Sequence, residues 1–266
     1  MFEYPLNVND LLNKTLSIKN KLNKTKKNIR ELNIYVLCGS TSNKLIDILE
    51  LFLLDNNIKP NFKISDYDRY YETALFKRDE IKKFKPDFIY IHTSIFNLKY
   101  IENSFIKDTE FRKAIKEEFR IFEKIWSALD ELNCTIIQNN FEFPLIRKIG
   151  NFDSVSFNGK TKYVIEVNKL FSEYSLKNKK LIINDINYLS SLYGLEKWFD
   201  YNLWFSFEKF IKYLKDPISA SLMIFICFKC FATFLINNFN NLIVTFRYKI
   251  YPSKVIPNHW RYKFTK

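Results

Sequence analysis

The stretch Leu32-Asn-Ile-Tyr-Val-Leu-Cys-Gly-Ser-Thr-Ser42 decides the fold, because an apolar β-rich run changes within it to a tight polar turn. A helix is predicted directly afterwards, over 44–55, since apolar residues recur there at helical spacing. Strand, tight turn and helix in this order form the first part of a crossover unit. The stretch therefore predicts the first strand of an α/β sheet.

The same order of elements repeats along the chain. Further strands are predicted at 61–64, 87–92, 134–138 and 180–184, with helical patterns between them at 69–84, 109–132 and 161–176. This alternation is typical of parallel strands joined by right-handed crossovers, with helices on both faces of the sheet. We predict a three-layer α/β/α sandwich with a mostly parallel sheet.

The chain is expected to divide into three parts. We expect an amphipathic entry helix within residues 1–31 and the α/β domain over residues 32–215. Residues 216–266 are expected to form a divergent helix followed by a basic tail. The apolar run at 222–236 is shorter than the roughly 20 apolar residues of a spanning helix, and Lys229 lies at its middle. We expect a buried helix there and no stable membrane span, with the residues from about 252 loosely held.

Composition limits the class of protein. The chain has 266 residues, 47% of them hydrophobic, with 27 Phe and only 4 Gly, which supports a large core and excludes a wholly disordered chain. The formal net charge of +13 suits a polyanion partner, but most lysines belong to helix faces and no nucleic-acid motif accompanies them. We therefore expect no nucleic-acid partner.

The four cysteines favour a reducing compartment over a disulfide framework. No signal peptide precedes the first predicted helix, so a cytoplasmic location is expected. Cys227 and Cys230 have the spacing of redox and zinc motifs, but no second pair with ligand spacing follows them. We predict no metal site and no cofactor.

Polar residues follow the predicted strands at the points where they end. Each of these residues also has an ordinary role, because Ser, Asn and Asp are common in turns and a lone His is typical of a hydrogen-bonded structural position. Together they predict a ligand site, since the carboxyl ends of parallel strands share one edge of the sheet, where folds of this class bind ligands. The candidate binding residues are Gly39, Ser40, Thr41, His92, Thr93, Asn97, Asn139, Asn140 and Asp185.

Four segments that contain most of these residues, together with Asn97, resemble the N-terminal domain of FkbH-like proteins. They are Val36-Leu-Cys-Gly-Ser-Thr-Ser-Asn43, Tyr90-Ile-His-Thr-Ser94, Ile136-Ile-Gln-Asn-Asn-Phe-Glu142 and Ile183-Asn-Asp-Ile-Asn-Tyr188. The segment around Trp198, Asp200 and Trp204 adds to the match, which covers roughly residues 2–215. In full-length members this domain precedes a phosphatase-like domain of the haloacid-dehalogenase superfamily, subclass IIIC, whose Asp-x-Asp-x-Thr motif acts with Mg²⁺.

The resemblance implies an accessory role, because no Asp-x-Asp-x-Thr motif occurs here and the sequence departs from the family pattern after Lys215. The family is bacterial and is associated with loading glyceryl units onto acyl carrier proteins, and with polyketide, capsule and other surface-glycan pathways. We expect a ligand-binding or partner-binding domain, either free-standing or the product of a truncated gene. Its expected partner is a separately encoded phosphatase-like protein or an acyl carrier protein.

The same domain is similar to SGNH-type hydrolases and acyltransferases, which implies an enzymatic alternative. In that comparison Ser40 stands at the nucleophile turn and Asp200 in the late acid-base block, with Gly39 and Asn139 or Asn140 near the oxyanion donors.

A nucleophilic serine needs a base within hydrogen-bond reach as well as oxyanion donors. Related sequences often have histidine after the tryptophan of the late block, whereas Phe205 follows Trp204 here. Two interpretations of Ser40 stay open. It is either the nucleophile of an esterase or acyltransferase, or a turn serine that caps the next helix or binds a ligand.

Overall fold

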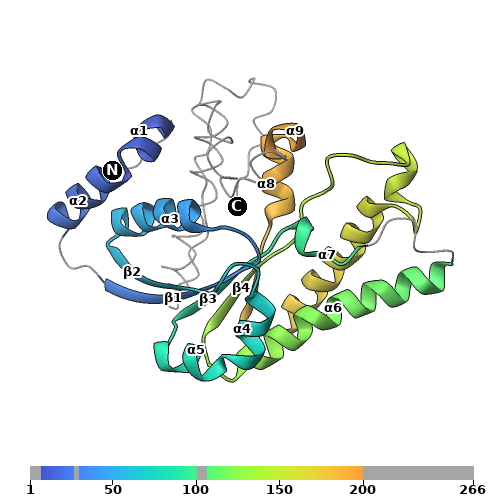
Figure 1. Ribbon diagram of the computed structural model, residues 1–266, viewed down its shortest axis with the longest axis horizontal. Coiled ribbons are helices and arrows are strands. Elements are labelled where there is room, and N and C mark those ends of the chain that lie inside the picture. The colour runs from blue at the N-terminus through green and yellow to red at the C-terminus, as the bar shows by residue number, and fades with distance from the viewer. Residues whose placement is uncertain (1–6, 27–29, 101–106, 200–266) are drawn as a thin grey trace, which may run out of the picture. The chain divides into compact units, whose positions relative to one another are not determined.

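All strands of the sheet run parallel. In this computed structural model the order is β2-β1-β3-β4-β5 (Figure 1). The strands are β1 (Arg30–Cys38), β2 (Ile58–Ile64), β3 (Phe88–His92), β4 (Thr135–Asn139) and β5 (Leu181–Asn184). Each of the four neighbouring pairs has parallel register.

The structure describes residues 7–26, 30–100 and 107–199. All of them belong to the first of the two units into which the chain divides, residues 1–232. The helix predicted at 222–236 and the basic tail lie outside the described residues, and so does Asp200.

Helices cover both faces of the sheet. On one face lies α3 (Asn43–Asp55), against which α2 (Thr15–Thr25) packs after the short α1 (Val8–Asn13) (Figure 1). On the other face lie α4 (Tyr70–Phe76), α5 (Arg78–Phe84), α6 (Asp108–Asp130) and α7 (Lys160–Lys177), while α8 (Ile186–Tyr193) and α9 (Leu195–Trp198) follow β5. This arrangement confirms the predicted α/β/α sandwich.

The central strand β1 is buried on both faces. Ile34, Tyr35, Val36 and Leu37 all have relative exposures of 1% or less. Because successive side chains of a strand point to opposite faces, Tyr35 and Leu37 join the cluster formed with α4 to α7 while Ile34 and Val36 face α3. A continuous apolar run is what a strand covered by helices on both faces requires.

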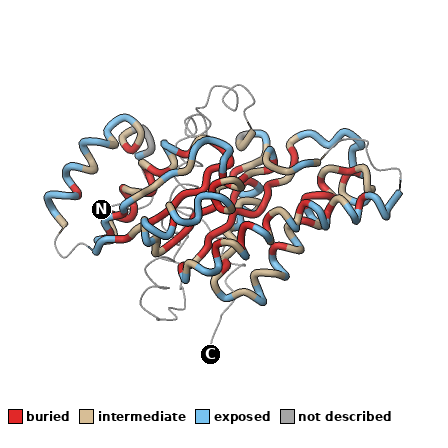
Figure 2. The backbone as a smooth tube through the Cα atoms, turned by 60° about the horizontal axis from the view of Figure 1, so that its bottom comes forward, coloured by how far each residue is buried: buried red, intermediate tan, exposed pale blue. Residues whose placement is uncertain are grey.

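The layer formed by α6 and α7 is held by packed aromatic rings. The Phe171 ring lies 4.9 Å from that of Phe122, 4.8 Å from that of Trp126 and 5.3 Å from that of Phe141, all edge-on. Figure 2 shows the buried residues concentrated in the strands and on the inner sides of these helices. Edge-on ring contacts of this kind add to the free energy of area burial.

Two local predictions needed correction. The helix predicted over 69–84 is two helices, because the backbone of Lys77 leaves the helical region between α4 and α5. The second strand begins at Ile58, earlier than the predicted 61, and includes Pro60. Proline is tolerated there because β2 is an edge strand with hydrogen-bonded pairing on one side only.

Replacing Phe122, which is fully buried, by alanine is expected to lower the free energy of unfolding by about 3–5 kcal/mol, because the cavity among its four ring neighbours cannot close. The matched control is Phe76→Ala on α4, where the side chain is 78% exposed, and its effect should stay within about 0.5 kcal/mol. Urea unfolding followed by tryptophan fluorescence measures both. Equal effects of the two substitutions would contradict the assigned core.

Candidate functional site

The chain leaves the carboxyl ends of β1 and β3 toward opposite faces of the sheet. After β1 it turns through Gly39 to Ser42 into α3, and after β3 it passes through the short 3₁₀ helix η1 (Ile95–Asn97) toward α6 on the other face. A sheet of order 2-1-3-4-5 has its topological switch point between these two strands, and ligands of such folds bind in the crevice there. The candidate site is therefore centred on the ends of β1 and β3.

A row of polar side chains crosses the sheet at this end. Cys38 pairs with His92, and Asn139 pairs with Asn184, in the backbone register. The paired register of β3 and β4 ends one position earlier, with Ile91 opposite Gln138, so His92 stands beside Asn139. We call Cys38, His92, Asn139 and Asn184 the polar row.

The amide of Asn139 is the hub of this row. Its Oδ1 accepts hydrogen bonds from the Tyr90 hydroxyl (3.1 Å) and from Asn184 Nδ2 (2.8 Å), while its Nδ2 donates to the carbonyl of Thr93 (3.2 Å). Because a backbone carbonyl only accepts, the Thr93 contact fixes which end of the amide is the donor. Asn139 is buried, so these bonds satisfy groups that water does not reach.

The orientation of Asn139 also determines the tautomer of His92. Asn139 Nδ2 lies 3.1 Å from His92 Nδ1, and the Tyr90 hydroxyl lies 3.2 Å from the same nitrogen. A proton on Nδ1 would face the amide N–H donor, so the Asn139 contact favours Nδ1 as the acceptor and, in neutral His92, the proton on Nε2. The Tyr90 hydroxyl gives its proton to Asn139 Oδ1, so it does not donate to Nδ1 as well. In that tautomer Nε2 donates a hydrogen bond and does not take a proton from a nucleophile.

A second set of bonds holds the end of β4 from the opposite face. Gln138 Nε2 donates to Thr93 Oγ1 and to the carbonyl of Asn139, both at 2.8 Å, and Trp126 Nε1 donates to Gln138 Oε1 at 3.3 Å. All these polar atoms belong to fully buried residues. Thr93, a predicted binding residue, is thus engaged inside the protein.

The turn after β1 is locked by Asn97. Its Nδ2 donates to the carbonyl of Gly39 (2.8 Å) and to Asp68 (3.1 Å), and its Oδ1 accepts from the backbone N–H of Ser94 (3.0 Å). A Cβ on residue 39 would lie 2.7 Å from Asn97 Oδ1, so only glycine lets the two loops approach this closely. Burial, followed by the charge of Glu72, raises the pKa of Asp68.

Ser40 does not cap α3. The residue that precedes the first turn is Ser42, whose hydroxyl lies 2.9 Å from the Cys38 thiol, and burial raises the pKa of that thiol. The Ser40 side chain is 4% exposed, and none of the described residues hydrogen-bonds to it. The capping interpretation of Ser40 is therefore wrong.

Two further polar atoms at this edge are buried and have no partner within the described ranges. They are the hydroxyl oxygen of Ser94 and the Oδ1 of Asn187. Buried polar atoms are normally paired with protein, water or ligand, because an unpaired one costs free energy. With the Ser40 hydroxyl, they give this edge hydrogen-bonding capacity that the described residues do not use.

Beyond the ends of β4 and β5, Asn140 and Asp185 form a further hydrogen-bonded pair. Asn140 Nδ2 donates to Asp185 Oδ1 (2.7 Å), which also accepts from the backbone N–H of Tyr188 and so caps α8. Asn140 Oδ1 accepts from the N–H of Asn187 (3.0 Å). These residues shape the edge of the site beside the unpaired Asn187 oxygen.

The structure thus brings the predicted residues to one edge but gives them different roles. Thr93, Asn139 and Asn140 are buried and bound to other protein groups, whereas His92 and Asn97 are bound but partly exposed, as is Thr41, and Asp185 is bound and exposed. Sequence reasoning missed Tyr90 and Asn184. Period-two spacing was a usable signal for Tyr90, which lies two residues before His92 and on the same face.

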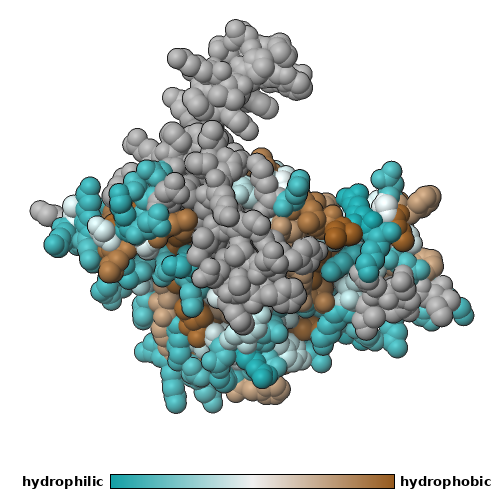
Figure 3. All heavy atoms as spheres, turned by 45° about the horizontal axis from the view of Figure 1, so that its top comes forward, coloured by the Kyte–Doolittle hydropathy of each residue, from teal (hydrophilic) through white to brown (hydrophobic). Residues whose placement is uncertain are grey.

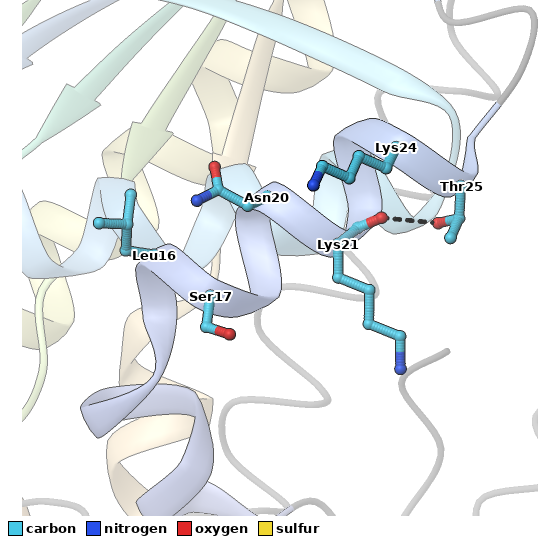
Figure 4. Close-up of a pocket in the computed structure, with 6 residues that line it drawn as sticks. All are labelled: Leu16, Ser17, Asn20, Lys21, Lys24 and Thr25. Atoms are coloured by element: carbon cyan, nitrogen blue, oxygen red, sulfur yellow. Dashed lines mark hydrogen bonds between the residues drawn. The ribbon is translucent and has the colours of Figure 1, made fainter.

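One pocket lies on α2, away from the strand ends. It has a volume of about 550 Å³, and its lining in the described part of the chain comes from one helix (Figure 4). The lining residues are Leu16, Ser17, Asn20, Lys21, Lys24 and Thr25.

Within residues 7–26, 30–100 and 107–199, no three His, Cys, Asp or Glu side chains are grouped to hold a metal ion. None of the helices described there combines the length and apolar character that crossing a membrane requires.

The tautomer of His92 can be tested directly, because the chain has only two histidines. In the His259→Gln background, ¹⁵N NMR of the imidazole is expected to show a protonated Nε2 and an unprotonated Nδ1 at neutral pH. The isosteric Asn139→Asp substitution replaces the amide donor by an acceptor, so it should move the proton to Nδ1. An Nδ1–H signal without that substitution would refute the assigned network.

The lock between the two loops can be tested by a double-mutant cycle. Gly39→Ala is expected to cost about 1–3 kcal/mol of stability, because the new methyl group overlaps Asn97. In an Asn97→Ala background the cost of Gly39→Ala should fall, giving a coupling of at least about 0.5 kcal/mol. Equal costs in both backgrounds would show that Asn97 does not set the requirement for glycine.

No family model matches the sequence, and no curated protein matches it. The fold is similar to a crystal structure described as the N-terminal part of the protein BF1531 from Bacteroides fragilis containing a phosphatase domain, complexed with Mg, at a TM-score of 0.60 and 15% identity. That match covers 75% of this chain and 54% of the other, so this chain spans about half the length of that structure. A GDSL-like lipase (BT0569) from Bacteroides thetaiotaomicron VPI-5482 matches at a TM-score of 0.37 and 11% identity, over 85% of this chain and 97% of the lipase.

An identity of 15% shows that this chain and the BF1531 structure share a fold. It does not show that they share an activity. The comparison agrees with the α/β fold of this chain. The sequence resemblance to the N-terminal domain of FkbH-like proteins is thereby confirmed at the level of the fold.

Proposed function

We propose that this chain is an accessory module that binds a polar acyl ligand, of the carrier-linked glyceryl class, at the switch point between β1 and β3. The ligand would be held for a separately encoded phosphatase-like partner or for an acyl carrier protein, in a bacterial polyketide or surface-polysaccharide pathway. The fold of BF1531, whose structure contains a phosphatase domain, supports the association with such a partner.

The observation that supports binding best is the division of hydrogen bonds at the strand ends. Within the polar row Asn139 is bound to His92 and Asn184, whereas the hydroxyls of Ser40 and Ser94 and the Oδ1 of Asn187 have no partner among the described residues. A glyceryl thioester has two hydroxyl groups and a carbonyl, which match such donors and acceptors. A fixed framework with unused hydrogen-bonding groups suits binding because little is reorganised when the ligand arrives.

The state of His92 favours binding over acyl transfer. With Nδ1 facing the Asn139 amide donor, the neutral imidazole has its proton on Nε2. A protonated nitrogen does not remove the proton of a serine hydroxyl. We therefore assign His92 a position beside the ligand and not the role of the base.

An esterase or acyltransferase that uses Ser40 is the second candidate. One observation favours it: Ser40 follows the central strand directly at the switch point, and its hydroxyl is not engaged by any described residue. Asp200, assigned by resemblance to the late acid-base block, lies outside the described residues. A reactivity probe separates the two functions.

Titration of the full chain with S-glyceroyl-pantetheine is expected to shift the His92 imidazole signals in a saturable manner. Ser94→Ala should weaken this binding by about 5-fold to 30-fold, the value of one or two neutral hydrogen bonds. Ser172→Ala, at an exposed position on α7, is the matched control and should bind as before. No shift of His92 at millimolar probe would overturn the binding proposal.

A fluorophosphonate probe tests the enzymatic alternative on the same protein. The binding proposal predicts no labelling of the unmodified chain, because no described group accepts a proton from Ser40. Labelling that disappears in Ser40→Ala would instead establish a nucleophilic serine and replace the binding module with the acyltransferase. Labelling that persists in Ser40→Ala would place the reactive group elsewhere.

A further inference from the structure

Asp68, in the loop between β2 and α4, brings a carboxylate to the switch point. Its Oδ1 accepts a hydrogen bond from Asn97 Nδ2 at 3.1 Å, and the same nitrogen donates to the carbonyl of Gly39 at 2.8 Å. An amide nitrogen has two protons, so both donors of Asn97 are committed. A ligand at this corner of the site therefore finds no uncommitted amide donor on Asn97, and it finds the carboxylate of Asp68 beside it.

The backbone of Asp68 lies in the left-handed region, with a φ of 54°. Asn57, Lys85 and Asn133 are the other non-glycine residues with positive φ in the described ranges, and each follows the end of a helix, where this conformation is common. Asp68 instead follows the strand β2, at the edge of the sheet where the candidate site lies. A residue held in this region at such a place indicates a functional constraint.

The acidic residues on either side of Asp68 are paired with cations. Asp66 pairs with Lys77 at 3.3 Å and Glu72 pairs with Arg69 at 3.2 Å, whereas no ion pair of Asp68 is found in the described part of the chain. The Asp68 side chain does not cap α4 either, because the start of that helix has no side-chain cap. Neither of the two usual structural roles of a surface aspartate therefore accounts for its position.

Exposure alone does not distinguish a carboxylate on this protein, because hydrophilic residues cover most of the described surface in view in Figure 3. Asp68 is exposed, but one of its oxygen atoms is held in place by Asn97. Its other oxygen, Oδ2, has no partner among the described residues. An ionised carboxylate only accepts hydrogen bonds, and a hydroxyl group is the donor that an uncharged acyl ligand can supply.

We propose that Asp68 is a specificity-determining residue of the ligand site, whose carboxylate accepts a hydrogen bond from a hydroxyl group of the acyl chain. This inference rests on the proposed function, and it adds the selection of a hydroxylated acyl group over an unsubstituted one of the same length. Hydrogen bonds to an ionised group are roughly twice as strong as those between neutral groups. The Asn97 bond holds the acceptor before the ligand arrives, which limits the entropy lost on binding.

Calorimetric titrations of the full chain with two thioesters test the selection. S-glyceroyl-pantetheine has two hydroxyl groups on its acyl chain, and S-propanoyl-pantetheine has the same chain without them. The unmodified protein is expected to bind the glyceroyl thioester about tenfold more tightly, the value of a hydrogen bond to a charged group. In Asp68→Asn this preference should fall to about twofold or less, with the affinity for the propanoyl thioester unchanged.

The substitution and its control are matched in charge and in place. Asparagine keeps an oxygen that Asn97 can bind and tolerates the left-handed backbone, so Asp68→Asn should fold as the unmodified chain does. Asp66→Asn removes the same charge from the same loop, where the carboxylate pairs with Lys77. This control should keep the tenfold preference for the glyceroyl thioester.

Each other outcome overturns the selection by Asp68. An unchanged preference in Asp68→Asn would remove its role and leave the proposed ligand site standing, and equal affinities of the unmodified chain for the two thioesters would do the same. Loss of both thioesters in Asp68→Asn alone would show that the residue only supports the structure. Absence of binding of either thioester by the unmodified chain would overturn the proposed function and this inference together.

Discussion

The hydrogen bonds of the Asn139 amide join three strands at the end of the sheet where the site lies. This single side chain reaches Tyr90, His92 and Thr93 on or after β3 and Asn184 on β5. Because the amide is buried, removing it would leave several polar groups without partners at once, which is more costly than losing one exposed bond. The positions of the site residues on β3, β4 and β5 depend on this hub.

At this edge, polar groups that are bound within the fold lie beside polar groups that have no described partner. Thr93 is bound to Gln138, and Asn140 is bound to Asp185. Asp185 also caps the start of α8. Ser94 and Asn187 have buried oxygen atoms without partners in the described part of the chain. Few polar atoms near the switch point therefore lack a described partner, although many polar residues lie at this edge.

Much of the fold was predictable from the sequence, because it depends on local patterns. The run from Leu32 to Cys38 is apolar at successive positions, as a strand covered on both faces must be, and Gly39 marks the turn that follows. The break at Lys77 was not predictable, since residues on both sides of it have helical patterns.

The site was predictable in position and not in detail. Strand ends identify the edge, but whether a polar side chain binds protein or ligand depends on partners that are distant in sequence. Asn97 locks the turn at Gly39 across 58 positions, and Gln138 engages Thr93 across 45.

Binding of an acyl ligand at the ends of β1 and β3 is tested most directly by a crystal structure of the full chain with S-glyceroyl-pantetheine. We expect an intact thioester there, with oxygen atoms within hydrogen-bond distance of Ser94 Oγ and Asn187 Oδ1. The His92–Asn139 contact should be preserved. A glyceroyl ester on Ser40 Oγ would contradict it, and so would a ligand bound away from these strand ends.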